Sequence, residues 1–182
     1  MTTAFLTAEK QKTVLAALKE RFGYINPMQA PKVTKVVVST GVGKVSDKKK
    51  RAQIEERIAR ITGQKPASRV AKKAIASFKS RAGDLVGFQV TLRGRNMWTF
   101  LDKLIHVALP RTRDFRGIKI EAIDEMGNIT IGIKEHTVFP ETADEDVRDI
   151  FGLAVTITTT AKTKEEAEAL FRHLGLPLRE RI

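Results

Sequence analysis

The chain has 182 residues, 42% of them hydrophobic, which suffices for one well-buried core and predicts a single domain over 1–182. It carries 33 Lys and Arg against 21 Asp and Glu, and the net charge of +12 indicates a polyanionic partner, either nucleic acid or an anionic membrane. The lack of cysteine excludes disulfides and thiolate zinc sites, and the lack of a long apolar run or a signal-peptide pattern predicts a cytoplasmic protein.

The first predicted element is an amphipathic helix. Val14, Leu18 and Phe22 recur at helical spacing on one face, and Gly23 supplies a stop signal. A valine-rich segment at 32–40 follows between proline and glycine residues, and its composition predicts a strand that is at least half buried.

The loop "STGVGKVSDKKKR" at 39–51 resembles the start of a phosphate-binding loop, because Gly41 and Gly43 precede a lysine. A Walker loop also needs an earlier glycine and a hydroxyl residue directly after the lysine, and Val38 and Val45 occupy those positions. The sequence therefore favours a sharp glycine turn between a strand and a helix, and the lysines after it require another anionic partner.

The next predicted helix starts at Ser46 as N-cap, carries Ile54, Ile58 and Ile61 on one face, and ends at Gly63. The stretch at 64–83 begins like a short strand and then becomes a basic, small-residue segment with neither the helical nor the strand period. We expect its part from Lys72 to Gly83 to form a long exposed loop.

The segment "DLVGFQVTLRG" alternates as a strand with one buried and one polar face. The core side is predicted to hold Val86, Phe88, Val90 and Leu92. The polar side is predicted to hold Gln89, Thr91 and Arg93. A helix then follows, with Asn96 as its cap and Pro110 at its end.

Three strands and a helix are predicted for the rest of the chain. Alternating isoleucines predict a hairpin of strands at 118–122 and 129–133, and "GLAVTITTTA" predicts the last strand. Thr163 and Glu166 form a capping-box pattern for a final helix that ends at Gly175.

The predicted order is α-β-α-β-β-α-β-β-β-α. Without regular βαβ alternation, this order indicates an α+β fold with helices packed on one face of a mainly antiparallel sheet. The other sheet face is left for Thr, Gln, Ser and Arg side chains.

This polar face predicts RNA binding. Basic residues cluster in the connections at 44–51, 65–81, 93–95 and 111–116, where they would flank the face and neutralise phosphates. The chain lacks the alternating aromatics of a base-stacking recognition motif. Phe78 and Phe115, each beside Lys or Arg, are candidates to stack on RNA, and packing on the core explains each of them equally well. A membrane partner is disfavoured because the bulky apolar residues are used on the helices' core faces.

Four segments carry a resemblance to a known family: "STGVGKVSDKKK", "ITGQKPASRVAKKAIASFKSRAGDLVGFQVTLRG", "MWTFLDKLIHVALPRTRDFRG" and "LAVTITTTAKTKEEAEALF". From about residue 9 to its end, the chain closely resembles the bacterial form of large-subunit ribosomal protein five, which binds 5S rRNA. The resemblance implies a structural role in the central protuberance of the large subunit. It also implies contacts with 23S rRNA and neighbouring large-subunit proteins, a loop that reaches toward P-site tRNA, and an intersubunit bridge to a small-subunit protein.

Carried over by position, the family's 5S-binding module falls on Ser39, Thr40, Gln64, Phe78 and Thr91. The polar face and the basic connections add Lys44, Lys65, Arg69, Gln89 and Arg93. The resemblance further implies an rRNA- or bridge-proximal basic group of Arg95, Arg111, Arg113 and Arg116. It places a tRNA-proximal group in the loop, at Lys72, Lys73, Lys79 and Arg81.

Two positions depart from the family pattern. The family usually has Asn where this chain has Ser39, so one hydroxyl replaces an amide that both donates and accepts. Arg69 stands where Ser or Thr is common, which would add either a phosphate contact or a surface charge.

Two other functions remain open. A non-ribosomal RNA chaperone could use the same surface, and an enzyme is the third alternative. The sequence shows no carboxylate pair or catalytic triad, and His106, His136 and His173 lie too far apart for a local metal motif. We therefore expect no enzymatic activity, no metal and no cofactor.

Overall fold

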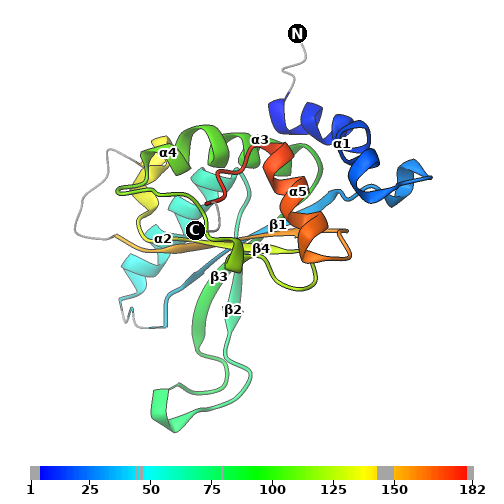
Figure 1. Cartoon of the computed structure of the whole chain (residues 1–182). Coiled ribbons are helices and arrows are strands. Elements are labelled where there is room, and N and C mark those ends of the chain that lie inside the picture. The colour runs from blue at the N-terminus through cyan, green and yellow to red at the C-terminus, as the bar shows by residue number, and fades with distance from the viewer. Residues whose placement is uncertain (1–4, 44, 46, 79, 143–149, 180–182) are drawn as a thin grey trace. The chain divides into compact units, whose positions relative to one another are not determined.

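The computed structural model describes residues 5–43, 45, 47–78, 80–142 and 150–179. The main elements are listed in chain order: α1 (Leu6–Phe22), β1 (Val33–Gly41), α2 (Lys48–Thr62), β2 (Ala67–Val70), β3 (Leu85–Leu92), α3 (Gly94–Lys103), α4 (Leu109–Arg111), β4 (Ile129–Ile133), β5 (Leu153–Thr159) and α5 (Lys164–Leu174) (Figure 1). The strands form one antiparallel sheet with the order β2-β3-β1-β5-β4. The predicted α+β class is confirmed.

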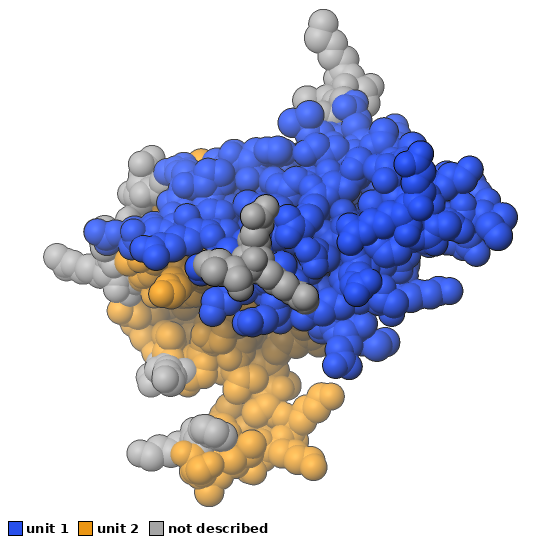
Figure 2. Space-filling view, in the orientation of Figure 1, with its two compact units in different colours: residues 1–36, 93–131, 156–182 blue, residues 37–92, 132–155 orange. Residues whose placement is uncertain are grey.

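The chain divides into two compact units (Figure 2). Unit 1 comprises residues 1–36, 93–131 and 156–182, and unit 2 comprises residues 37–92 and 132–155. Strands β1, β4 and β5 each contribute residues to both units.

In unit 1, α1 packs against α5 and α3. Its predicted apolar face is confirmed for Val14 and Leu18, which are buried, and Gly23 ends the helix in the left-handed conformation. The start of α1 is tied to the end of α3, because the Thr7 amide and hydroxyl both donate to Oδ1 of Asp102, over 2.9 and 2.6 Å. This double hydrogen bond supplies the cap that the residue before α1 lacks.

The predicted start of the third helix is wrong, and its predicted end at Pro110 is one residue short of the observed one. Arg93, and not Asn96, precedes its first residue. At the other end, residues Leu104–Ala108 form a π-helical turn, and α4 then carries Pro110 in its first turn. The helical residues therefore run without a break from Gly94 to Arg111, the residue directly after Pro110.

The predicted strand at 118–122 is also wrong. Residues Ile120–Ala122 form a 3-10 turn. The flanking isoleucines make isolated bridges instead: Ile118 pairs in parallel with Leu178, and Ile123 pairs antiparallel with Ile129. The isoleucines recur because their side chains are buried within unit 1, as Ile118, Ile120 and Ile123 all are.

In unit 2, β2 and β3 pair antiparallel and α2 packs against β3. Ser46, the predicted N-cap of α2, lies outside the described residues, and the cap is Asp47, which accepts from the Lys49 amide over 2.8 Å. Gly87 on β3 lies close to the backbone of β1. A Cβ there would lie 2.6 Å from the Thr40 carbonyl oxygen, so only glycine fits without displacing backbone.

Candidate nucleic-acid interface

Strand β3 separates a buried face from a polar face, as predicted. Phe88, Val90 and Leu92 are at most 3% exposed, while Gln89 and Thr91 are half-buried on the opposite face. Val86 departs from the pattern because it is 36% exposed. The buried residues hold the strand in place, and the outward hydroxyl and amide are thereby presented at fixed positions.

Strand β2 adds a cation to this polar face. Ala67 lies opposite Gln89 in the register, so Arg69 points to the same side of the hairpin as Gln89. The guanidinium Nε of Arg69 donates to Oε1 of Gln89 over 2.7 Å. This hydrogen bond orients the Gln89 amide, and it gives Arg69, one of the two departures from the family pattern, a defined place beside the polar strand face.

Strand β1 follows β3 in the sheet, and its two predicted site residues point in opposite directions. Ser39 is half-buried on the face away from Val36 and Val38. Thr40 shares the core side with those valines, is buried, and donates its hydroxyl to the Gly152 carbonyl over 2.7 Å. Because neighbouring residues on a strand face opposite sides, only Ser39 of the two lies on the polar face.

The turn at Gly41 and Gly43 does not need glycine for its geometry. Neither residue has a positive φ. A Cβ at Gly41 would meet nothing within 4 Å, and one at Gly43 would make an ordinary contact of 3.9 Å with Val86 Cγ1. The predicted turn between a strand and a helix is present, since the Val45 amide donates to the Val42 carbonyl over 3.0 Å, but neither glycine adopts the left-handed conformation there.

The loop between β2 and β3 continues the hairpin (Figure 1). Ile75 and Ser80 exchange backbone hydrogen bonds of 3.0 and 3.3 Å, and Oδ2 of Asp84 accepts from the Arg81 amide over 2.7 Å. Lys72, Lys73 and Arg81 are exposed, as expected for a basic loop. The loop lies between β2 and β3, and its backbone is paired across the hairpin at Ile75 and Ser80.

The remaining predicted residues fall into three groups. Gln64 and Lys65 are exposed after the end of α2. Lys44, Lys79 and the side chain of Phe78 lie outside the described residues. The third group belongs to unit 1 and is exposed after β3 and around α4: Arg93, Arg95, Arg111, Arg113 and Arg116. Phe115, the second stacking candidate, is half-buried in unit 1.

The outward threonines of unit 1 were predicted as part of the same polar face. Thr156 and Thr158 are half-buried and alternate with the buried Val155 and Ile157. The hydroxyls of Thr130 on β4 and Thr156 on β5 are hydrogen-bonded to each other over 3.0 Å. Each hydroxyl keeps a further hydrogen-bonding capacity, because a hydroxyl can donate once and accept twice.

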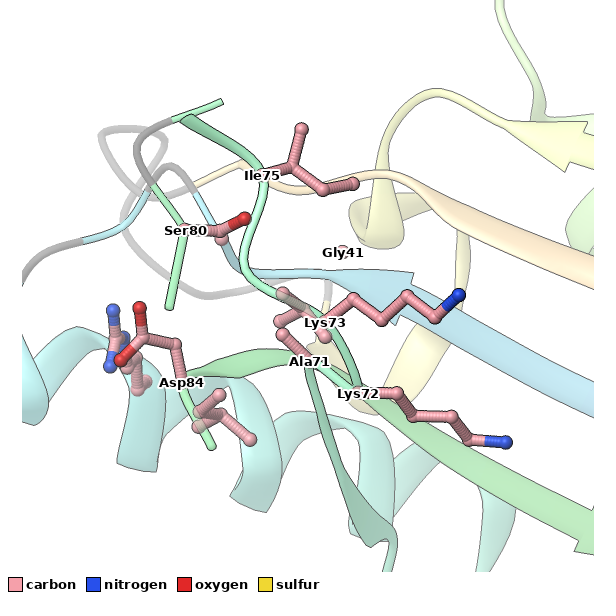
Figure 3. A pocket seen from close by; sticks show the side chains of 11 residues that line it. Gly41, Ala71, Lys72, Lys73, Ile75, Ser80 and Asp84 are labelled. Atoms are coloured by element: carbon pink, nitrogen blue, oxygen red, sulfur yellow. The ribbon is translucent and has the colours of Figure 1, made fainter. Parts of the chain in front are cut away.

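Sequence reasoning missed a pocket in unit 2. It has a volume of about 990 Å³ and lies between the β1–α2 turn and the base of the β2–β3 loop (Figure 3). Its lining residues are Gly41, Gly43, Arg51, Ala71, Lys72, Lys73, Ile75, Ser80, Asp84, Leu85 and Val86. The clustered glycines and lysines were visible in the sequence, but nothing in it showed that 41–51 and 71–86 meet.

The described residues offer hydroxyl, amide, ammonium and guanidinium groups, which are the groups that bind phosphates and 2′-hydroxyls. Among them, no group of three or more His, Asp or Glu side chains could hold a metal ion. No helix in the described part of the chain is long and apolar enough to span a membrane.

Two family models match the chain. Residues 26–81 match the model for ribosomal protein L5, and residues 85–178 match the model for the C-terminus of the same ribosomal protein family. The chain is also similar over nearly its whole length to proteins named large ribosomal subunit protein uL5. That of Rubrobacter xylanophilus is 51% identical over 93% of this chain and 94% of its own. That of Flavobacterium johnsoniae is 49% identical over 98% of both chains, and that of Ureaplasma urealyticum is 46% identical over 97% of both.

Proposed function

The chain belongs to the ribosomal protein L5 family, and on that premise we propose that it binds 5S rRNA through the polar face of its sheet. It is a structural constituent of the large subunit of the cytoplasmic ribosome and not an enzyme. In this proposal the whole chain serves as one 5S rRNA-binding domain in the central protuberance.

The hydrogen bond between Arg69 and Gln89 is the observation that carries the proposal. The 2.7 Å bond joins two of the residues predicted for the RNA site and fixes the Gln89 amide with a donor group still available. Thr91 and Ser39 share this outward face on β3 and the neighbouring β1. On this surface the hydroxyls and the amide can bind 2′-hydroxyls and phosphate oxygens, and the guanidinium can bind a phosphate of the RNA backbone.

The other proposed partners are those that the family resemblance implies, and the exposed basic residues supply their contacts. We assign the exposed Lys72, Lys73 and Arg81 of the β2–β3 loop to P-site tRNA. Arg95, Arg111, Arg113 and Arg116 of unit 1 are assigned to 23S rRNA or to the bridge with a small-subunit protein. Neighbouring large-subunit proteins complete the set of partners.

Binding to purified 5S rRNA tests this function, with tRNA at equal concentration as the competitor. We expect selective retention of 5S rRNA, and for about five phosphate contacts a log–log salt slope of about −3 to −5. Equal retention of both RNAs would instead identify a general RNA chaperone, and a slope near zero would contradict the electrostatic contribution. Chelation of zinc at constant magnesium should leave binding unchanged.

A further inference from the structure

The segment that joins α1 to β1 in unit 1 presents two apolar side chains to solvent (Figure 1). Among the large apolar side chains that the structure describes, Ile25 and Met28 are the most exposed, at 91% and 80%. They lie three residues apart on one turn, which includes the 3-10 helix Pro27–Gln29. Side chains that remain in water contribute nothing to the core, so the fold of the chain gives no reason for two apolar residues here.

Hydrogen bonds between side chains and backbone order this turn. Oε1 of Gln29 accepts from the amides of Ile25 and Asn26 over 3.0 and 3.1 Å. In return, Oδ1 of Asn26 accepts from the Met28 amide over 2.9 Å. The two side chains form a capping box, with Pro27 in the first helical position. Because the backbone is already ordered, little conformational entropy is lost when the turn binds a partner.

The turn is uncharged although the chain is strongly basic. No residue in 24–31 carries a charge, while the whole chain has a net charge of +12. The flanking cations are Lys32 and Arg21, and the Arg21 guanidinium lies 5.3 Å from the centroid of the Phe22 ring. RNA binding requires cations next to phosphates, whereas the centre of a protein–protein interface is depleted in charge and enriched in methionine. The composition of the turn therefore favours a protein partner over RNA.

We propose that Ile25 and Met28 insert into an apolar pocket on a neighbouring protein of the large subunit. The pocket is lined by aliphatic and aromatic side chains, to which the flexible thioether of Met28 adapts and with which its sulfur makes favourable contacts. A few buried anchors of this kind carry most of the binding energy of an interface. The inference rests on the chain's place in the large subunit and not on 5S rRNA binding, because the turn lies outside the polar strand face.

Photo-crosslinking in assembled large subunits tests the class of partner. The chain is made with photo-methionine, a diazirine analogue of nearly the same shape, which on illumination reacts with whatever lies against it. We expect the Met28 peptide to be joined to an apolar segment of another large-subunit protein. If Met28 is joined only to rRNA, or reacts only with water, the proposal is overturned.

Two matched serine variants test the apolar contact. Met28→Ser removes an anchor, and Met126→Ser makes the same change at another exposed side chain of unit 1, which is 74% exposed. A high-salt wash weakens the contacts with RNA and leaves apolar burial intact. We expect Met28→Ser to be lost from washed large subunits about tenfold more readily than Met126→Ser, the scale of one truncated interface anchor. Equal losses would contradict the proposal.

A conservative variant and the free protein complete the test. Met28→Leu keeps an apolar side chain and should be retained like the parent, so a loss as large as that of Met28→Ser would count against apolar burial. As free proteins, Met28→Ser and the parent should unfold at the same temperature and bind purified 5S rRNA equally well. Weaker 5S rRNA binding by Met28→Ser would overturn this inference alone, whereas a parent protein that does not bind 5S rRNA would refute the proposed function alone.

Discussion

The buried hydroxyl of Tyr24 donates a hydrogen bond to Oε1 of Glu166 within unit 1. The other carboxylate oxygen of Glu166 accepts from the Lys162 amide over 2.7 Å, and its own amide donates to Thr163 Oγ1 over 3.3 Å. The predicted cap of α5 is therefore confirmed for Thr163, while the Glu166 side chain reaches Lys162 and Tyr24. One carboxylate thus joins the start of α5 to the segment after α1.

Replacing Tyr24→Phe should destabilise the fold. The variant keeps the ring but leaves one oxygen of a buried carboxylate without its donor, which costs about 1–3 kcal/mol. Denaturant unfolding measures this loss, and 5S rRNA affinity should stay at the parent value because the pair contributes no side chain to the polar strand face. An unchanged free energy of unfolding would show that water replaces the donor.

The same pair predicts alkaline sensitivity. Burial, then the hydrogen bond to Glu166 and its negative charge, raise the pKa of Tyr24 well above the ordinary value of 10.0. The folded protein keeps the phenol proton where the unfolded chain releases it, so this stabilisation is complete below about pH 10 and is lost as pH rises further. The free energy of unfolding should fall more steeply above about pH 10 in the parent than in Tyr24→Phe. Parallel curves would contradict the raised pKa.

Thr91→Val should separate binding from folding. Valine keeps the β-branched shape on an outward, half-buried position of β3, so stability should change little. Loss of the hydroxyl should weaken 5S rRNA binding by about 0.5–1.5 kcal/mol, the scale of one net hydrogen bond. A variant that binds normally but unfolds readily would place the Thr91 hydroxyl in the structure of the protein and not in its interface.

Two exposed cations should act on different RNAs. Lys65→Gln removes a charge from the predicted 5S site, and Arg81→Gln removes one from the β2–β3 loop. Lys65→Gln should reduce the magnitude of the salt slope for 5S rRNA by about one, and Arg81→Gln should leave it unchanged. In ribosomes carrying Arg81→Gln, P-site tRNA should dissociate faster than in ribosomes carrying Lys65→Gln. Equal dissociation rates would exclude the loop arginine from tRNA binding.

Periodicity predicted most of the fold because a buried face leaves a direct trace in the sequence. The alternation in β3 predicted both the inward Phe88 and the outward Thr91. It failed at Ile118, because an isoleucine that is buried by a single bridge to Leu178 has the same neighbours in sequence as one in a strand. The same alternation in β1 puts Ser39 and Thr40 on opposite faces, whereas the family resemblance assigned both of them to the 5S site.

The site was harder to predict than the fold. The Arg69–Gln89 bond depends on the register of β2 against β3, which no local pattern specifies. The pocket joins segments about thirty residues apart, and no local pattern shows that they meet. Local patterns carry torsional and burial preferences, and long-range proximity has no comparable local trace.

The bond between Tyr24 and Glu166 also sets an order of events during synthesis. Its two residues are 142 positions apart, and α1 packs on α5, which is translated near the end of the chain. At about 5–20 residues per second, roughly seven to thirty seconds separate the synthesis of Tyr24 from that of Glu166, and α1 has only its contact with α3 until α5 is made. Unit 1 therefore closes only after translation is nearly complete, and a nascent-chain chaperone that shields Val14 and Leu18 would act in this interval.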